Sequence, residues 1–295
     1  MRIGTRASAL ALAQAELVAQ ALAGGEVVPM VTSGDRGAAV GDKSRWVAEL
    51  ERALADGEID LAVHSAKDLP GELADGLALA GAPARARAED VLCGADSLQA
   101  LSPGASVGTS SVRRAAQLRA AREDVVVVAM RGNVDTRLHK LERGDFDAIV
   151  LARAGLQRLG REDSVGGVLD PAWFVPAPGQ GTLALEARAG DARVREALAA
   201  ITDADAFACL LAERALAQAL DASCHTPLGA HAALAQGGMR MRAWVGLPDG
   251  SAWVSDELEG DAADPEALGR EIAERIKRVG GAEILSAAER WPVSA

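Results

Sequence analysis

The sequence predicts an α/β protein in which two units of alternating strands and helices precede a smaller α+β domain. With 295 residues, about half of them apolar, the chain is long enough to build two or three cores. Strand and helix patterns alternate through residues 1–82 and again through 87–175, as in sheets of parallel strands. After residue 182 the pattern changes to a long helix followed by alternating segments, which favours an antiparallel sheet.

The first unit begins with a strand at Ile3. The elements expected after it are helix 8–22, strand 27–32, helix 46–55 and strand 59–65. Residues 34–44 are rich in glycine and in charge, so this segment is either a solvated connector or a lid over a site.

In the second unit each strand leads into a helix: 106–108 into 112–121, 125–130 into 134–143, and 147–151 into a helix ending at 159. Residues 176–181 contain two prolines and two glycines, which indicates a hinge between domains. The expected domains are 1–82 together with 182–199, then 87–175, then 204–295.

The third domain is expected to begin with an amphipathic helix over 204–220, capped by Asp203. The elements expected after it are an antiparallel meander of segments 230–234, 239–247 and 252–258, a turn at 248–251, and a helix over 265–279.

The charge and the cysteine count exclude several classes of protein. A formal net charge of −11 argues against a general nucleic-acid or membrane binder, yet residues 105–160 contain ten Lys/Arg and six Asp/Glu, a local balance of +4. Three cysteines and four scattered histidines predict neither a disulfide framework nor a metal site. Without an apolar signal segment or a stretch able to span a bilayer, the protein is expected to be cytoplasmic.

Five of the expected buried strands end in a turn that carries Arg or Lys. These cations are Arg6, Lys67, the pair Arg113 and Arg114, Arg131, and Arg153. The carboxyl ends of strands in an open α/β sheet face the ligand crevice, where helix N-termini already favour anions. Cations are unfavourable there unless an anion is bound, so the sequence predicts a ligand with several negative charges.

The densest of these turns is residues 108–114. Thr109, Ser110 and Ser111 supply hydroxyl and backbone N–H donors, and one of the serines can cap the helix that follows. Arg113 and Arg114 lie in the first helical turn, where the macrodipole opposes each cation by ~0.3–1 kcal/mol. A bound carboxylate would reverse that sign, so binding is favoured over two solvated arginines.

Two further turns leave alternatives open. Arg137 can lean back toward the turn of Arg131 and Gly132, but a surface pair with Asp135 is equally consistent. Asp68 lies among the cations, where a carboxylate stays ionised and can stabilise a cationic intermediate or take a proton. A Lys67–Asp68 surface pair explains the same spacing.

The remaining candidates are one histidine and one cysteine. His64, taken alone, is more typical of a packed core residue than of a catalyst. Cys93 and Cys209 lie in apolar runs typical of a core, whereas Cys224 lies in a loop beside His225, which can lower the pKa of its thiol. An inert loop thiol is the alternative for Cys224.

Six stretches, in order along nearly the whole chain, resemble the hydroxymethylbilane synthase family, also called porphobilinogen deaminase. They are IGTRAS (3–8), DLAVHSAKDLP (60–70), VGTSSVRR (107–114), RGNVDTRL (131–138), PGQG (178–181) and CHTPLG (224–229). The resemblance implies two periplasmic-binding-protein type II-like domains around a cleft, and a small C-terminal α+β domain. It also implies a dipyrromethane cofactor, bound through a thioether to the cysteine that matches Cys224.

The implied activity is that of a transferase in tetrapyrrole (haem) biosynthesis. It joins four porphobilinogen molecules head to tail on the dipyrromethane primer, releases ammonia, and then hydrolyses off hydroxymethylbilane. Each pyrrole carries an acetate and a propionate, and loss of ammonia gives a methylenepyrrolenine cation. Asp68 matches the family's catalytic carboxylate, which stabilises positive charge on pyrrole nitrogens and assists proton transfer.

The resemblance also implies the binding residues. Besides Cys224, the cofactor-binding positions match Ser65, Lys67, Asp68, Thr109, Ser110, Ser111, Arg113, Arg114, Arg131 and Gly132. The substrate-binding positions match Arg6, Ser8, Arg137, Gln180 and, as the one clear match in the lid, Lys43. Arg153 matches no motif and is expected to be solvated. No metal, nucleic acid or membrane is implied, and the protein is expected to be a monomer.

The alternative to an enzyme is a noncatalytic type II solute- or effector-binding module for a polycarboxylate. Such a module would share the basic turns at the strand ends, but it would need neither Cys224 nor Asp68.

Overall fold

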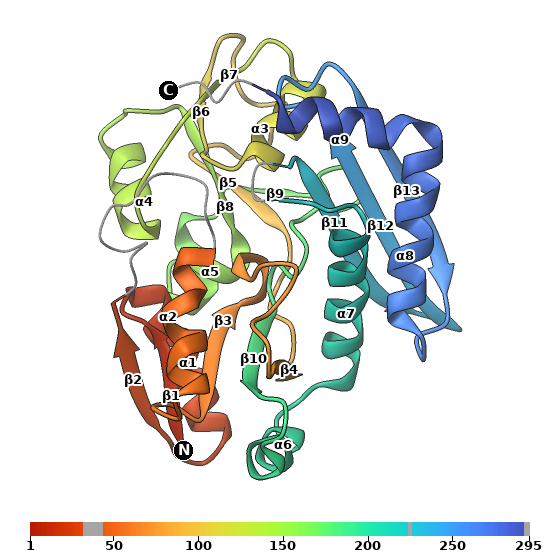
Figure 1. The fold of residues 1–295 in the computed structure, drawn as a ribbon. Coiled ribbons are helices and arrows are strands. Elements are labelled where there is room, and N and C mark those ends of the chain that lie inside the picture. The colour runs from red at the N-terminus through yellow and green to blue at the C-terminus, as the bar shows by residue number, and fades with distance from the viewer. Residues whose placement is uncertain (32–43, 224–225, 292–295) are drawn as a thin grey trace.

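The computed structural model describes residues 1–31, 44–223 and 226–291, and the strands in these ranges form three sheets. Two of the sheets have five strands each and the third has three. In Figure 1 the first five-stranded sheet lies below the second, and the three-stranded sheet with its helices lies to one side of both.

The first sheet has the strand order β2-β1-β3-β10-β4. Its strands are β1 (Arg2–Arg6), β2 (Glu26–Met30), β3 (Leu61–Ser65), β4 (Leu77–Gly81) and β10 (Leu183–Arg188). Its helices are α1 (Ala9–Ala21), α2 (Ser44–Ala55) and α6 (Ala192–Ala199), and a 3-10 turn, η1 (Ala66–Asp68), follows β3. β3 is a nearly continuous apolar run because this central strand is covered on both faces.

The second sheet repeats this arrangement with the order β7-β6-β8-β5-β9. Its strands are β5 (Asp90–Cys93), β6 (Ser106–Gly108), β7 (Val126–Val128), β8 (Ala148–Ala152) and β9 (Gly167–Leu169). The helices that accompany them are α3 (Val112–Ala121), α4 (Val134–Glu142), α5 (Arg153–Arg158) and the 3-10 turn η2 (Glu162–Ser164).

The prediction of parallel sheets is wrong for one strand in each sheet. β10 runs antiparallel between β3 and β4, and β5 runs antiparallel between β8 and β9. Both strands adjoin segments that cross between the two sheets, residues 82–89 and 176–182. Neighbouring strands are parallel when a helix carries the chain back to the starting edge of the sheet. A strand that enters directly from a crossing segment has no such helix before it, so it can run antiparallel to its neighbours.

The third unit contains the predicted meander. The strands β11 (Leu228–Ala235), β12 (Gly238–Gly246) and β13 (Trp253–Gly260) pair antiparallel in sequence order. Its helices are α7 (Ala204–Ala219), α8 (Pro265–Ile276), a π-helical turn η3 (Lys277–Gly281), and α9 (Ala282–Glu289). Asp203 caps α7 as predicted, since its carboxylate accepts a hydrogen bond from the N–H of Ala206 at 2.8 Å.

The core of the third unit lies between α7, α8 and one face of the meander. Met239, Met241 and Ile272 are fully buried there together with Leu216. Separate apolar clusters underlie the first and second sheets. The domain boundaries proposed from the sequence stay a prediction.

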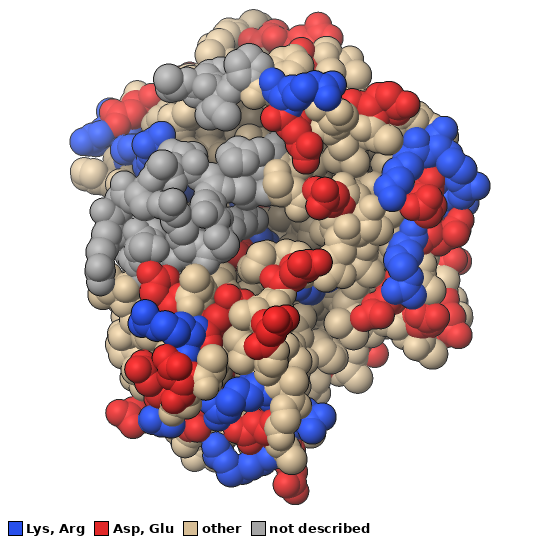
Figure 2. Space-filling model, viewed as in Figure 1, with Lys and Arg blue, Asp and Glu red and all other residues tan. Residues whose placement is uncertain are grey.

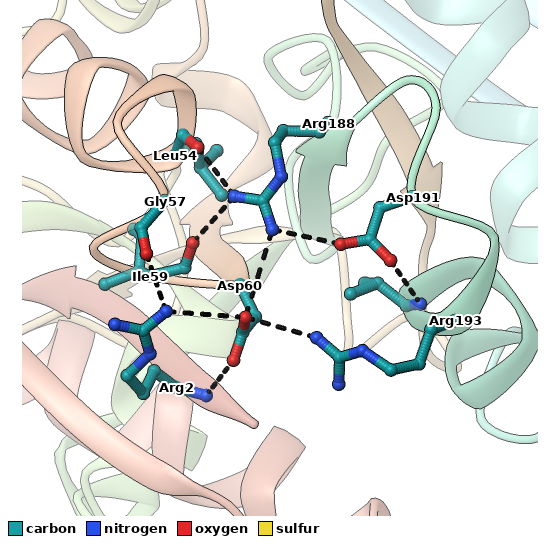
Figure 3. A network of polar contacts seen from close by, with 9 residues as sticks. Arg2, Leu54, Gly57, Ile59, Asp60, Arg188, Asp191 and Arg193 are labelled. Atoms are coloured by element: carbon teal, nitrogen blue, oxygen red, sulfur yellow. Dashed lines mark hydrogen bonds and ion pairs between the residues drawn. The ribbon is translucent and has the colours of Figure 1, made fainter.

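A network of polar contacts fastens β10 to the rest of the first sheet, at the end away from η1 (Figure 3). Arg188 Nη1 donates to the carbonyls of Leu54 (2.6 Å) and Ile59 (3.0 Å), and its Nη2 lies 3.0 Å from Asp191 Oδ2. Asp60 accepts from the backbone N–H of Arg2 at 2.7 Å. Although burial alone would raise the pKa of Asp60, that hydrogen bond and neighbouring arginines lower it.

Replacing Arg188 with alanine is expected to destabilise the protein by about 1–3 kcal/mol, because two backbone carbonyls and Asp191 lose their donor. The measurement is urea unfolding followed by circular dichroism. Arg193→Ala is the matched control, since Arg193 is largely exposed and contributes one ion pair to Asp60. An equal loss of stability in both variants would contradict this role for Arg188.

Within residues 1–31, 44–223 and 226–291, no helix has the length and apolar character needed to cross a membrane. The same ranges contain no cluster of three or more His, Cys, Asp or Glu side chains suited to holding a metal ion.

Candidate active site

A cleft lies between the first and second sheets, at the carboxyl ends of β3 and β8. Its larger pocket has a volume of about 100 Å³, or about 550 Å³ with the open mouth included. A smaller pocket of about 60 Å³ shares Leu10, Gln14, Ser65 and Asp68 with the larger one. The two pockets therefore form one continuous cleft, and Asp68 lies where they meet.

The charged residues that line the larger pocket are mostly cationic. They are Lys67, Arg114, Arg137 and Arg158, against a single carboxylate, Asp68. On the face shown in Figure 2, in contrast, acidic and basic side chains are interspersed. The lining of this pocket is therefore more cationic than that face, and the pocket can hold a ligand with several carboxylates.

Arg114 is oriented by a buried carboxylate, Asp90. Its Nε lies 2.9 Å from Asp90 Oδ1, and its Nη1 donates to the carbonyl of Val150 at 3.0 Å. Asp90 has no exposed surface and also lies 2.7 Å from Nη1 of Arg113. Burial alone would raise the pKa of Asp90, but the charges of Arg113 and Arg114 outweigh it and lower the pKa to about 2.

Arg113 and Arg114 were both predicted to bind the ligand, and the structure separates them. Only Arg114 lines the pocket. Arg113 donates to the carbonyl of Val175 at 2.8 Å, and its guanidinium lies 5.8 Å from the centre of the Phe174 ring. Neighbouring helical residues point about 100° apart, so Arg113 supports Asp90 while Arg114 faces the cleft.

Replacing Asp90 with asparagine is expected to destabilise the fold by about 3–5 kcal/mol, since two buried guanidinium groups lose their counter-charge. In the unmodified protein the stabilisation from Asp90 is present above its unfolded pKa of about 4. It is lost as the pH falls through about 2, the folded pKa. Denaturant unfolding at several pH values measures both effects.

The matched control for Asp90→Asn is Asp124→Asn. Asp124 pairs with Arg122 on the surface, with 44% of its side chain exposed. Its substitution is expected to change the unfolding midpoint little. An Asp90→Asn variant as stable as this control would contradict the proposed counter-charge.

Lys67 and Asp68 lie on η1, directly after β3. Burial, followed by the charge of Arg114, lowers the pKa of Lys67 to about 8, although Asp68 and Asp90 oppose the shift. Next to them Gln14, only 3% exposed, donates to Ser65 Oγ at 2.8 Å. The carboxyl end of β3 thus presents an ammonium, a hydroxyl and a carboxylate to the cleft.

Two arginines on the opposite wall complete the cationic lining. Arg137 Nε donates to the carbonyl of Gly132 at 2.8 Å, and burial together with Arg114 lowers its pKa to about 10. Arg158 Nη2 donates to the carbonyl of Gly181 at 2.6 Å, and burial lowers its pKa to about 10. Arg158 was not among the predicted residues, because it lies at the end of α5 and not in a strand-end turn.

The hydroxyl residues of the turn before α3 mainly support the backbone. Thr109 is buried, and its Oγ1 accepts from the N–H of Ser111 at 3.2 Å. Ser110 Oγ accepts from the N–H of Met130 at 3.1 Å and donates to the carbonyl of the same residue. Ser111 caps α3 by accepting from the N–H of Arg114 at 3.4 Å.

Three other predicted residues lie outside the lining of both pockets. Arg131 and Gly132 are exposed, and Gly132 has a φ of +122°. Gln180 is 1% exposed and donates to the carbonyl of Ala88 at 2.7 Å and to Asp90 at 3.0 Å. Gln180 therefore contacts the counter-charge of the arginines, not the pocket.

The smaller pocket is lined by Arg6, Ser8 and His64 in addition to the shared residues. Ser8 caps α1 by accepting from the N–H of Ala11 at 3.3 Å. His64 is buried and its Nε2 lies 2.8 Å from Glu186 Oε2, in keeping with the prediction of a packed histidine.

Three predicted residues need separate mention. Arg153 is not solvated as expected: its guanidinium lies 3.8 Å from Glu89, and its side chain is 28% exposed. Cys224 and Lys43 lie outside the described residues.

Comparison with known proteins shows which family combines these features. Residues 1–196 match the model of the porphobilinogen deaminase dipyrromethane cofactor-binding domain, and residues 207–278 match that of the porphobilinogen deaminase C-terminal domain. The chain belongs to the porphobilinogen deaminase family. Porphobilinogen deaminases are transferases of tetrapyrrole biosynthesis, so the predicted enzyme class is confirmed.

Similar porphobilinogen deaminases span almost the whole chain. The protein of Thermus thermophilus is 44% identical over 96% of this chain and 97% of its own length. Those of Xanthomonas oryzae pv. oryzae and Roseiflexus castenholzii are 45% and 44% identical, each over 97% of this chain and 99% and 98% of their own. Among solved structures, an ABC-transporter periplasmic substrate-binding protein from Coxiella burnetii aligns over 68% of this chain and 91% of its own, with 15% identity and a TM-score of 0.41.

The cleft residues fit the dipyrromethane cofactor of this family. Two pyrrole rings with an acetate and a propionate each carry four carboxylates, and four cations line the larger pocket. Thr182 also lines it, and its buried Oγ1 has no hydrogen-bond partner within the described part of the chain.

Proposed function

We propose that this cleft carries out the stepwise condensation of porphobilinogen into hydroxymethylbilane, with Asp68 as the catalytic carboxylate. The observation that carries the proposal is the position of Asp68, a carboxylate at the junction of two connected pockets whose other lining charges are mainly cationic. The roles of the individual residues below belong to the same proposal.

The cations of the cleft bind the carboxylates of the pyrrole rings. Arg114, Arg137 and Arg158 offer planar guanidinium groups, which form charge-assisted hydrogen bonds to carboxylates. Because burial lowers the pKa of all three cations Lys67, Arg137 and Arg158, a bound carboxylate relieves an electrostatic cost as well as making new contacts. Arg6 and Ser8 extend the same function into the smaller pocket.

Asp68 acts on the substrate. The protonated amino group of the aminomethyl side chain of porphobilinogen leaves as ammonia, with the electron pair of the broken C–N bond going to nitrogen, and the methylene carbon remains on the ring as a cationic centre. The Asp68 carboxylate stabilises this charge through the pyrrole N–H, and it takes the proton that is released when the new C–C bond forms. The bound dipyrromethane supplies the nucleophilic ring carbon for the first addition.

Cys224 is the proposed covalent anchor, assigned from the sequence motif. The described residues on either side of it contact each other: Thr226 Oγ1 accepts from the N–H of Ser223 at 3.0 Å, and Ser223 O accepts from the N–H of Thr226 at 3.2 Å. These contacts join Ser223 to Thr226 just after the end of α7. A thioether at this loop would retain the growing chain in the cleft through four additions.

The test of the proposed function combines product formation with intact mass. The purified protein is expected to convert porphobilinogen to hydroxymethylbilane and to weigh more than its sequence by one dipyrromethane. An active preparation with the mass of the bare chain would refute the covalent primer. The alternative, a noncatalytic binding module, is not favoured by the family and predicts binding without release of ammonia.

The remaining expectations from the sequence stay predictions. They are the roles of Lys43, Arg131, Gly132 and Gln180 toward the ligand, a monomeric state, a cytoplasmic location and the absence of a nucleic-acid partner.

The charge of Lys67 is expected to give the enzyme a basic pH limit. Lys67 is protonated below about pH 8 and neutral above it, so carboxylate binding weakens as the pH rises. Because the carboxylates of the bound cofactor favour the charged form of Lys67, the limit in the holoenzyme lies above this value, and kcat/KM is expected to fall about tenfold per pH unit beyond it. In Lys67→Met this basic limit should disappear, and kcat/KM should be low at every pH. Lys277→Met is the control and should keep both the limit and the kcat/KM of the unmodified protein. Persistence of the limit in Lys67→Met would assign it to another group.

A further inference from the structure

A carboxylate of the third unit, Glu213 on α7, is completely buried and accepts hydrogen bonds on both oxygens. Oε1 lies 2.7 Å from Arg85 Nη1 and 2.7 Å from the N–H of Ala232. Oε2 lies 3.3 Å from Arg85 Nη2 and 2.6 Å from the N–H of Gly179. Every lone-pair direction of this carboxylate is therefore directed at a donor from another part of the chain.

Glu213 thus joins the two segments that connect the first and second sheets. Arg85 belongs to the first connection, residues 82–89, and Gly179 to the second, residues 176–182. Arg85 Nε also donates to the carbonyl of Gln180 at 2.9 Å, which links the two connections directly. In Figure 1, α7 stands between the third sheet and the strands β10 and β4 of the first.

The second connection is in direct contact with the catalytic turn. Gly179 has a φ of +73°, and a Cβ atom added to it would lie 2.8 Å from Ala66 Cβ and 3.0 Å from Lys67 N. No side chain can be accommodated at this position without moving η1, the turn of Lys67 and Asp68. Gly179 also lines the larger pocket.

The same connection reaches the opposite wall of the cleft. Gln180 Nε2 lies 3.0 Å from Asp90 Oδ1, and Asp90 orients Arg114. A shift of residues 179–180 would therefore displace η1 on one wall and the counter-charge of Arg114 on the other.

We propose that Glu213 is a positioning residue for the reaction: it fixes residues 179–180, and through them the placement of Lys67, Asp68 and Arg114. This inference rests on the proposed function. The proposed function itself does not depend on Glu213. The third unit, which carries Cys224, thereby also fixes the two walls of the cleft relative to each other. Glu213 does not line either pocket, so it acts through the chain and not on the substrate.

The test compares Glu213→Gln with the unmodified holoenzyme. The amide is isosteric, but its NH₂ group must face an N–H donor, that of Gly179 or that of Ala232, and in both orientations Arg85 loses its counter-charge. A small displacement of the reacting groups is expected to lower kcat by about tenfold or more with little change in KM.

A second readout follows Lys67 directly, independent of turnover. An amine-reactive acylating reagent is applied over a range of pH, and modification of the Lys67 peptide is measured by mass spectrometry. The pKa is about 8 for the chain alone, and bound cofactor carboxylates raise it, so the midpoint of each variant is compared with that of the unmodified protein at equal cofactor content. In Glu213→Gln the midpoint should rise by about one unit as solvent reaches the amine. Lys277, on the surface, serves as the internal reference in the same digest.

The groups that face Lys67 are Arg114, Asp68, Asp90 and Arg113, and all of them are retained in Glu213→Gln. A change in its midpoint would therefore report movement and not a lost neighbouring charge. Gln218→Ala is the control on the same helix, because Gln218 donates to the carbonyl of Gly71 at 2.6 Å and contacts neither connecting segment. It should leave kcat and the Lys67 midpoint unchanged.

Loss of one partner of a buried ion pair can prevent folding, so a second variant removes both. Arg85→Met combined with Glu213→Leu replaces the pair by apolar side chains of similar volume, which proteins generally tolerate. The folded double variant should show the same change in kcat and in the Lys67 midpoint. If both quantities match the unmodified protein, the proposed positioning role is overturned.

The outcomes separate this inference from the proposed function. If the unmodified protein forms no hydroxymethylbilane but the Lys67 midpoint shifts in Glu213→Gln, the proposed function fails, while the effect of Glu213 on the placement of Lys67 stands. If the product forms normally in Glu213→Gln and the midpoint is unchanged, the positioning role fails and the proposed function stands.

Discussion

Replacement of Asp68 by asparagine is expected to lower kcat by about 10²–10⁴-fold while leaving the dipyrromethane attached. The amide keeps the volume and can still accept a hydrogen bond, but it cannot stabilise the cation left by ammonia or take the released proton. Because Asp68 lies at the junction of two pockets whose lining is otherwise cationic, no other lining carboxylate among the described residues replaces it. Product formation gives kcat, and intact mass gives the cofactor content of the same sample.

The matched control is Asp75→Asn, a substitution at an exposed position seven residues further along the chain. Its turnover is expected to equal that of the unmodified protein. Near-normal turnover in Asp68→Asn, with cofactor present, would show that the carboxylate is not needed for the chemistry. A variant that loses the cofactor as well would instead place Asp68 among the residues that hold it.

Replacement of Cys224 by serine is expected to abolish covalent attachment and with it all measurable turnover. A serine hydroxyl is a far weaker nucleophile than a thiolate at neutral pH, so the thioether cannot form. Denaturing mass spectrometry should then give the mass of the bare chain. Cys209→Ala is the control, because Cys209 is buried in the core of the third unit, and burial raises the pKa of its thiol to about 11.

The Cys209→Ala variant should keep both the added mass and the activity. A Cys224→Ser protein that still carried the added mass under denaturing conditions would move the anchor to another residue. A Cys224→Ser protein with the bare mass and normal turnover would show that the reaction does not depend on a tethered primer.

The strand-end cations could be predicted from the sequence because they depend on local order alone. A buried strand followed by a turn places the next cation at the sheet edge, and Lys67, Arg114 and Arg6 all line the cleft. A cap of α3 by one of the two serines was predictable for the same reason, since a cap is made within four residues, and Ser111 makes it. Contacts between residues that are far apart along the chain leave no such local pattern in the sequence.

Asp90 illustrates what the sequence did not reveal. It reads as the polar first residue of a short strand, and its role depends on Arg113 and Arg114, more than twenty residues away. The sequence assigns both arginines and Gln180 to the ligand but does not show that all three also contact Asp90. Arg158 was missed for a related reason: it reaches the pocket from the far end of α5, at a helical position with no turn to mark it.

The alternation of strands and helices predicted the α/β class and the three parallel strands of each sheet, but not β10 and β5. Pairing partners across a crossing connection are not encoded in local periodicity, and the first three residues of β10 and the last three of β5 are apolar, as in a parallel core strand. His64 and Glu186 show the same limit, since their contact at 2.8 Å exists only because β10 pairs with β3.

The insertion of β10 between β3 and β4 has a consequence for synthesis on the ribosome. β3 cannot complete its hydrogen bonding until residues 183–188 have emerged, roughly 120 residues after Ser65, which takes about 6–24 s at ordinary elongation rates. Throughout that interval one edge of this apolar strand has no partner and is exposed to neighbouring nascent chains. The second sheet, in contrast, has all five strands within residues 90–169 and can close first. The N-terminal unit, although made first, is therefore expected to finish folding after the unit that follows it.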